Sequence, residues 1–253
     1  QYIVKDVEMR PNTVTNTTLA NGNIQQTIPE LVTPNAQHNI NGAQIQTNWI
    51  FSDNNSLIAG ADIWGRRVTS DRTKYVTVNV INPDGKILKT NNIERGETPI
   101  PTASSTSTGF YVNDDLHLLN NKMTISIGGR VDKIWVKNEE CYDVDYIIMN
   151  GVRNDKPANQ RVTFEKNNLN DLSWSANIGV LYKLTGNVDA VLNIARSYRA
   201  PSIEERYKYI DLGNYVRLGN PDLKAENGYS GDMGIRIWGK RLTIQASIFA
   251  NRG

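Results

Sequence analysis

Cysteine and histidine are scarce in this sequence of 253 residues, which contains one cysteine and two histidines. Cys141 alone cannot form an internal disulfide, and His38 and His117 lie too far apart along the chain to suggest a metal cluster. No pattern pairs a nucleophile with a base, and no glycine-rich phosphate loop is present. We therefore expect no catalytic residues, no metal site and no bound cofactor.

A predominance of one charge sign is also missing. The 28 basic and 26 acidic residues leave a formal net charge of +2, which gives no general reason to expect nucleic acid as a partner. No apolar run reaches the roughly 18 residues of a transmembrane helix, but barrel strands of about ten alternating residues would escape that criterion. Gln1 is not an initiator methionine and no secretion leader follows it, so we expect a processed chain or a fragment.

What the sequence does contain is a repeated alternation of apolar and polar residues. In the stretch 123–132, Met123, Ile125 and Ile127 share one face of a strand, whereas Arg130 and Asp132 share the other. Such stretches predict strands with one apolar and one polar face. The predicted apolar, lipid-facing set is Ile125, Ile127, Trp174, Ile178, Leu242 and Ile244, and the predicted lumen-facing set is Arg130, Asp132, Asn177 and Gln245.

The connections between these stretches alternate in length. Short connections are predicted at 52–55, 119–122, 184–187 and 238–241, and long ones at 82–106, 137–170 and 198–226. This order is typical of an up-and-down transmembrane barrel, which has tight turns on one rim and extended loops on the other. We predict eight strands between about residue 43 and residue 252, further strands at 1–10 and 23–28, and all three long loops on one side.

A soluble β-sandwich that binds a ligand remains the alternative, because its strands also alternate and its turns are also rich in Gly, Asn and Asp. Two features favour the barrel. The strands run for about 11–15 residues, beyond the usual five or six. Charges such as Asp189 and Arg236 lie in mid-strand on the polar face, where a water-filled lumen would accept them. The predicted fold class is therefore all-β and antiparallel, with the transmembrane barrel preferred.

Two further stretches, "ARSYRAPSIEERY" and "GNPDLKAENGYSGDMGIRIW", carry a paired motif. Together with 56–75 and 108–132 they resemble the TonB-dependent outer-membrane receptors, over about residues 55–253. The motif positions are Tyr198, Arg199, Ala200 and Pro201, then Asn220, Pro221, Asp222 and Leu223, then Glu226.

The resemblance implies a barrel of about 22 strands with a separate N-terminal plug. Residues 1–253 would then be part of that barrel, with the plug and the terminal strands absent. It also implies the outer membrane of a Gram-negative bacterium, contact with membrane lipid, and coupling through the plug to the TonB protein of the inner-membrane energy-coupling complex. The implied function is import of a scarce nutrient, namely an iron chelate, a siderophore, haem or cobalamin.

The loop between the two halves of the motif is the expected place of ligand contact. We interpret its ends as anchors, because prolines fix the backbone where the chain leaves the sheet and Arg199 can pair with Glu226. The anchor set is Tyr198, Arg199, Pro201, Asn220, Pro221, Leu223 and Glu226. Aromatic and cationic residues suit a flat anionic ligand, so the expected ligand-binding set is Tyr207, Tyr209, Tyr215 and Arg217.

Haem receptors of this family usually place a histidine ligand between the two halves of the motif. Residues 202–219 contain no histidine, although a tyrosine can also ligate haem iron. His38 lies in a stretch interpreted as an outside loop and is a second candidate, whereas His117 lies at a short turn and is given no ligand role. The rings expected at the two membrane interfaces are Tyr75, Trp135, Trp174, Tyr182 and Trp238.

Overall fold

A computed structural model describes residues 1–211 and 216–253. Thirteen strands form one antiparallel sheet, and two small two-stranded sheets lie outside it. None of the described helices is long and apolar enough to cross a membrane. In chain order the elements are β1 (Tyr2–Asp6), β2 (Thr15–Thr18), β3 (Ile24–Ser52), β4 (Asn55–Ile81), β5 (Ile87–Glu97), β6 (Ala103–Leu118), β7 (Met123–Asn138), β8 (Cys141–Tyr142), β9 (Tyr146–Met149), β10 (Val152–Asn154), β11 (Val162–Phe164), β12 (Asn167–Thr185), β13 (Val188–Arg199), α1 (Ile203–Tyr207), β14 (Tyr209–Asp211), β15 (Val216–Leu218), β16 (Glu226–Trp238) and β17 (Thr243–Arg252).

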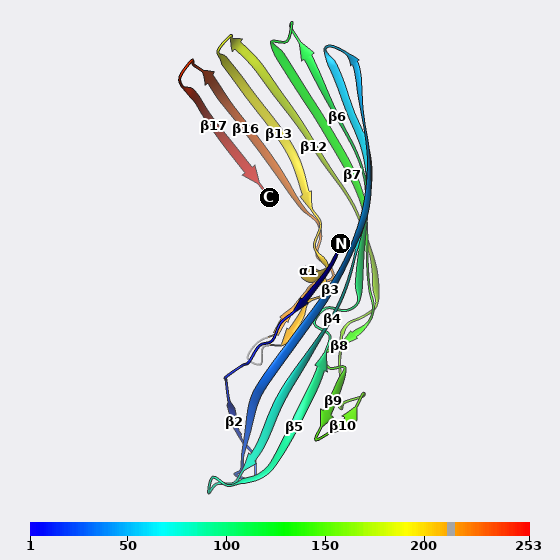
Figure 1. Cartoon of the computed structure of the whole chain (residues 1–253), viewed down its shortest axis with the longest axis vertical. Helices are drawn as coiled ribbons and strands as arrows, with labels where there is room; N and C mark the ends of the chain where they lie inside the picture. The colour runs from blue at the N-terminus through cyan, green and yellow to red at the C-terminus, as the bar shows by residue number, and fades with distance from the viewer. Residues whose placement is uncertain (212–215) are drawn as a thin grey trace.

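The main sheet is a strongly curved wall in which neighbours along the chain are mostly neighbours in space (Figure 1). The order β3-β4-β6-β7-β12-β13-β16-β17 is antiparallel throughout, as an up-and-down barrel requires. The four short turns lie together at one end of the wall, and the long connections lie toward the other (Figure 1). The prediction that the three long loops share one side is confirmed.

The strand faces agree with the predicted register. Ile127 of β7 pairs with Ile178 of β12, and both are more than two-fifths exposed on the outer, convex face. Arg130 lies on the inner face, where its guanidinium contacts Asp62 at 2.6 Å and also Asp132. A sandwich would cover these exposed apolar residues with a second sheet, and the described residues contain none that does so. The sandwich alternative is therefore wrong.

The N-terminal part of the wall contains more strand than the sequence predicts. The stretch 33–44, interpreted as a loop containing His38, lies inside β3, which pairs along its length with β4. The long segment 82–106 contains β5, which continues the sheet beyond β4. Asn, Gln and Thr occupy both faces of these extensions. A strand wetted on both faces loses the alternation by which strands are recognised in sequence, although its backbone pairing is unchanged.

The interface rings divide into two groups. Trp174, Trp135 and Tyr182 lie on the outer face, with Tyr182 toward the short turns and Trp174 toward the long loops. Trp238 is instead on the inner face, where its indole Nε1 donates to Asp189 at 3.0 Å. Tyr75 lies about twenty residues along β4 from its short turn, beyond the ten or so that cross the apolar band. The prediction of an interface position is wrong for Trp238 and Tyr75.

A hydrophobic cluster lies on the inner face of the wall at the level of the long loops. It brings together β4, β6 and β7 with the loop segments that fold back over them, including α1 (Figure 1). The buried members are Val68, Ile100, Ala103, Ile134, Val136, Cys141, Phe164, Ile203 and Tyr207. The loops therefore have a packed core of their own inside the curve of the barrel.

Candidate functional site

Helix α1 lies within the loop that the paired motif encloses, where no helix was predicted. Its first turn is closed by a capping box, in which the Ser202 side chain accepts from the Glu205 amide at 3.2 Å. In return the Glu205 carboxylate accepts from the Ser202 amide at 2.8 Å. The reciprocal pair satisfies amides that a five-residue helix could not satisfy internally. The "SIEE" stretch carries this signature in the sequence.

The apolar face of α1 packs against the inner wall. Ile203 and Tyr207 are 2 % and 0 % exposed, and both belong to the hydrophobic cluster. The ring of Phe164 meets Tyr207 edge-on, with centroids 5.6 Å apart, in the geometry that aromatic pairs favour. Burial of two large side chains from so short a helix holds the loop against Ile134 and Val136 of β7.

A polar contact joins the opposite side of α1 to the N-terminal wall. Arg66 of β4 forms a forked ion pair with Glu204, with Nη1 at 3.2 Å from Oε2. The same guanidinium lies 2.9 Å from His38 Nδ1, and because arginine only donates, this nitrogen must accept. Burial opposes the charge of Glu204, but the Arg66 hydrogen bonds prevail and lower the pKa of this carboxyl. His38 is thus a buried member of a partly buried polar network on the inner wall, and it does not lie in a loop.

Arg206 connects α1 to the wall strand β12 and to the second half of the paired motif. It is almost fully buried, and it donates to the Asp171 carboxylate of β12 at 2.8 Å and to the Pro221 carbonyl at 2.9 Å. The Asn220 amide donates to the Glu205 carbonyl at 3.0 Å. The second half of the motif therefore closes directly onto the helix that follows the first half.

The ion pair anticipated between Arg199 and Glu226 is present. Arg199 donates to Glu226 at 2.8 and 3.0 Å, and it also reaches both oxygens of Glu205. The Ser202 amide and then the Arg199 guanidinium lower the pKa of Glu205. Because Arg199 and Glu226 are exposed, the pair contributes mainly to the geometry of the loop base.

The three described residues that were predicted to bind ligand do not come together. Tyr207 is buried in the hydrophobic cluster, so the expectation that it is available to a ligand is wrong. Tyr209 is half-buried, and its amide donates to the Pro99 carbonyl at 2.7 Å. Tyr209 pairs with Leu218 whereas Arg217 pairs with Ile210, so Tyr209 and Arg217 lie on opposite faces of the β14–β15 hairpin. Tyr215 lies outside the described residues.

A second buried cluster, which sequence reasoning missed, is centred on Glu97 at the end of β5. Its side chain is fully buried, and its carboxylate forms ion pairs with Arg72, with Lys74 at 3.0 Å and with Arg95 at 2.9 Å. Lys74 also donates to the Asp211 carbonyl at 3.3 Å, which ties β4 to the hairpin. The alternation of β4 would have placed Arg72 and Lys74 on one face. Nothing in the sequence pointed to Glu97, whose strand was interpreted as a loop.

The remaining candidates have structural surroundings. His117 lies beside a short turn and contacts Thr124 Oγ1 at 3.1 Å. Cys141 is a buried free thiol of the hydrophobic cluster. No group of three or more His, Cys, Asp or Glu residues within the described ranges could hold a metal ion.

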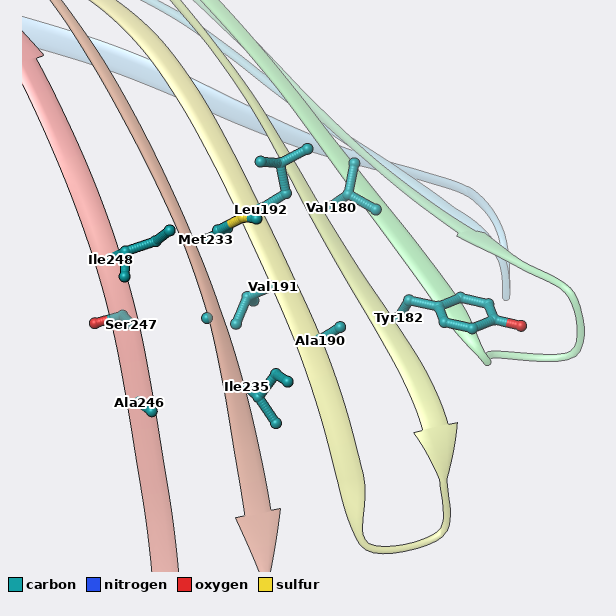
Figure 2. A pocket seen from close by; sticks show the side chains of 11 residues that line it. Val180, Tyr182, Ala190, Val191, Leu192, Met233, Ile235, Ala246, Ser247 and Ile248 are labelled. Carbon is teal, nitrogen blue, oxygen red and sulfur yellow. The ribbon is translucent and has the colours of Figure 1, made fainter.

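A shallow apolar hollow of about 550 Å³ lies on the outer face of β12, β13, β16 and β17 (Figure 2). Val180, Leu192, Met233, Ile235 and Ile248 line it, and Tyr182 stands at its edge toward the short turn (Figure 2). These are the outward residues of their strands. The hollow is consequently part of the apolar surface that faces lipid, and it is unsuited to a polar nutrient.

The comparison with known families agrees with this architecture. Residues 7–252 match the model of the "TonB dependent receptor-like, beta-barrel" family. The chain belongs to this family. Its members are transport receptors whose barrels lie in the outer membrane of Gram-negative bacteria.

Individual relatives are more distant. The chain is 30% identical over 129 residues to "TonB-dependent heme receptor A" of Haemophilus ducreyi, a match that covers 50% of this chain and 16% of that protein. The fold of this chain is similar to that of the Serratia marcescens hemophore receptor HasR in complex with HasA and heme. The TM-score is 0.50 at 12% identity, and the match covers 99% of this chain and 45% of HasR. The copper transporter OprC gives a TM-score of 0.47 at 12% identity, over 90% of this chain and 37% of that one. The chain thus spans less than half the length of these proteins.

Proposed function

We propose that this chain forms wall and loops of a TonB-dependent importer that captures haem or a similar flat iron chelate at the outer surface. The observation that carries the proposal is that Arg199 pairs with Glu226 at the base of the loop and that α1 packs onto the inner wall. Cargo that enters the barrel along this part of the wall from the long-loop side would meet α1. The chain acts in transport, and we assign it no catalytic role.

Haem is the favoured cargo because the protein to which half of the chain is 30% identical is named as a heme receptor. The hairpin after α1 presents Tyr209, which is half-buried, and Arg217, which is exposed. A tyrosine can ligate haem iron, and an arginine can bind a propionate. Movement of cargo past α1 would follow plug rearrangement driven by the TonB protein, with the plug supplied by parts of the receptor outside this chain.

Equilibrium binding and uptake by the full-length receptor test the proposal. Haemin should bind more tightly than a ferric siderophore or cobalamin, and growth on haemin as the iron source should require both the receptor and TonB. Binding of cobalamin alone, or TonB-independent growth, would overturn it.

Substitutions separate contact from support. Alanine at Tyr209, Tyr215 or Arg217 should weaken haemin binding by more than about 1 kcal/mol, or about fivefold, if the side chain contacts cargo. Tyr207→Ala removes a buried ring and should chiefly destabilise the loop. Pro221→Ala should disturb the anchoring while the contact residues remain. Unchanged affinity after removal of all three contact side chains would show that the loop is a gate and would move the binding site elsewhere.

A further inference from the structure

The residues on the outer face of the wall change from uncharged to positively charged toward the long loops. From the short turns onward, the outward residues of β4, β7, β13 and β17 are uncharged for most of a membrane crossing. The first charged residue then met on that face is a cation in all four strands. These residues, which we call the outward cations, are Arg67, Lys133, Arg196 and Arg252.

In the part of the chain that the structure describes, no carboxylate neutralises the outward cations. Within the residues that the structure describes, none of the four forms an ion pair. On the outward face of β4 and β6 the acidic residues lie elsewhere. Asp114 is near the short turns, where Asn55 donates to it at 3.0 Å, and Asp71 is farther out than Arg67. The long-loop edge of the apolar band is therefore positively charged.

Arg196 shows how such a cation is held. Its guanidinium carbon lies 3.7 Å from the centre of the Trp174 ring and 6.0 Å from that of Tyr229. Its Nη2 donates to the Asn227 side chain at 2.6 Å. Both rings are about half exposed, at 49% and 57%. Stacking on aromatic faces orients the guanidinium and leaves its charge without an anion.

A cation on the lipid face is costly at the bilayer midplane but nearly neutral in cost at the interface, where headgroups can reach it. Aromatic rings prefer the same depth. In barrels with short periplasmic turns, the long-loop side faces outward, so the anions available at this depth are those of lipids in the outer leaflet. We propose that the outward cations form a binding belt for the phosphate groups of a phosphorylated lipid in that leaflet.

The test uses the full-length receptor purified in detergent and titrated with lipid A, either phosphorylated or stripped of its phosphates. The belt variant is Lys133→Gln with Arg196→Gln. The matched control is Lys166→Gln with Arg153→Gln, which removes the same charges from the loops. Arg153 also stacks on an aromatic ring, with its guanidinium carbon 3.8 Å from the centre of Tyr146.

We expect the belt variant to bind phosphorylated lipid A at least about tenfold more weakly, since each interfacial cation contributes about fivefold. The control should bind like the wild type, and dephosphorylated lipid A should bind all three proteins equally. Inorganic phosphate at the same concentration should not displace the lipid. Equal binding by the belt variant and the wild type, an equal loss in the control, or wild-type binding that is indifferent to the phosphates would overturn the proposal.

Folding of each variant is checked by heat-modifiable migration, and Lys133→Gln alone provides a second measurement. No hydrogen bond or ion pair involves the Lys133 ammonium within the described ranges, so this variant should fold. It should still lose about fivefold in affinity for phosphorylated lipid A. An unchanged affinity in this folded variant would also count against the belt.

Discussion

At the scale of single residues, the inner wall is distinguished by polar side chains buried in pairs. Glu97, Arg206 and Asp132 are each about 2% exposed or less, and each has an oppositely charged partner. Burying such charges is tolerable only because they are paired, and removing one partner typically costs about 3–5 kcal/mol. The pair between Arg206 and Asp171 therefore restricts which positions of α1 are compatible with the wall.

Cys141 offers a residue-scale test of the loop core. Burial raises the pKa of its thiol from 9.0 to about 11, which reduces the thiolate fraction at neutral pH about a hundredfold. We expect alkylation by iodoacetamide at pH 8 to be at least about a hundredfold slower in the folded receptor than in denatured protein.

The variant Ile203→Ala should accelerate alkylation, because it opens a cavity in the hydrophobic cluster that contains Cys141. It should lower the free energy of unfolding by about 2–5 kcal/mol. Ile87→Ala, at a half-exposed position in β5, is the matched control and should react like the wild type. Rapid alkylation of the wild type would contradict the packing of the loops on the inner wall.

At the scale of elements, α1 is held by packing on one side and by charge on the other. The Glu204–Arg66 pair links it to a strand 138 residues away in sequence. Since the folded pKa of Glu204 is lowered, its contribution to stability is present above the unfolded value of about 4.3 and is lost as pH falls through the folded pKa. Acid should thus loosen α1 before the sheet unfolds.

Hydrogen exchange of the segment 199–211 measures this effect. At pH 7, Glu204→Gln should raise the amide exchange rate of this segment about tenfold or more. The reason is that a hydrogen bond to a charged group typically contributes about 1.5–3 kcal/mol. Glu165→Gln, at an exposed position, should leave exchange unchanged. Lowering the pH through the lowered pKa of folded Glu204 should loosen the wild type, after correction for intrinsic rates, but should have little further effect on Glu204→Gln. Equal pH responses in both proteins would exclude Glu204 as the titrating group.

The wall strands allow a second element-scale prediction. Ile127→Arg places a charge on the lipid face of β7 and should cost about 2–4 kcal/mol if the position is near the bilayer midplane. Ser247→Arg places the same side chain on the inner face of β17, opposite Gly234, and should be tolerated. Urea unfolding in lipid vesicles gives both free energies, and equal costs would refute the assignment of the two faces.

At the scale of the whole molecule, the wall is polarised between its two ends. Short turns gather at one end, and at the other β4, β5 and the loop segments extend past the apolar band (Figure 1). The loop core, the Glu97 cluster and α1 all belong to the second end. Any recognition of cargo by this chain is expected there.

Labelling in intact cells tests this orientation with two lysines replaced by cysteine in a Cys141→Ser background. Lys86→Cys lies in the exposed turn between β4 and β5, and Lys122→Cys lies in the short turn between β6 and β7. A membrane-impermeant maleimide should label Lys86→Cys and should reach Lys122→Cys only after the outer membrane is broken. The reverse pattern would invert the assigned orientation.

The sequence by itself determined the strand faces of the lipid-crossing region, the short turns and the family motif. Each of these is a local property, since an alternation with a period of two depends only on neighbouring residues and on what the two faces meet. The tertiary structure decided the burial of Tyr207, the inner-wall position of His38 and the three cations around Glu97. These depend on contacts between residues far apart in the chain, such as Glu204 with Arg66. They occur where strands leave the bilayer and water on both faces removes the alternation that marked the rest of the wall.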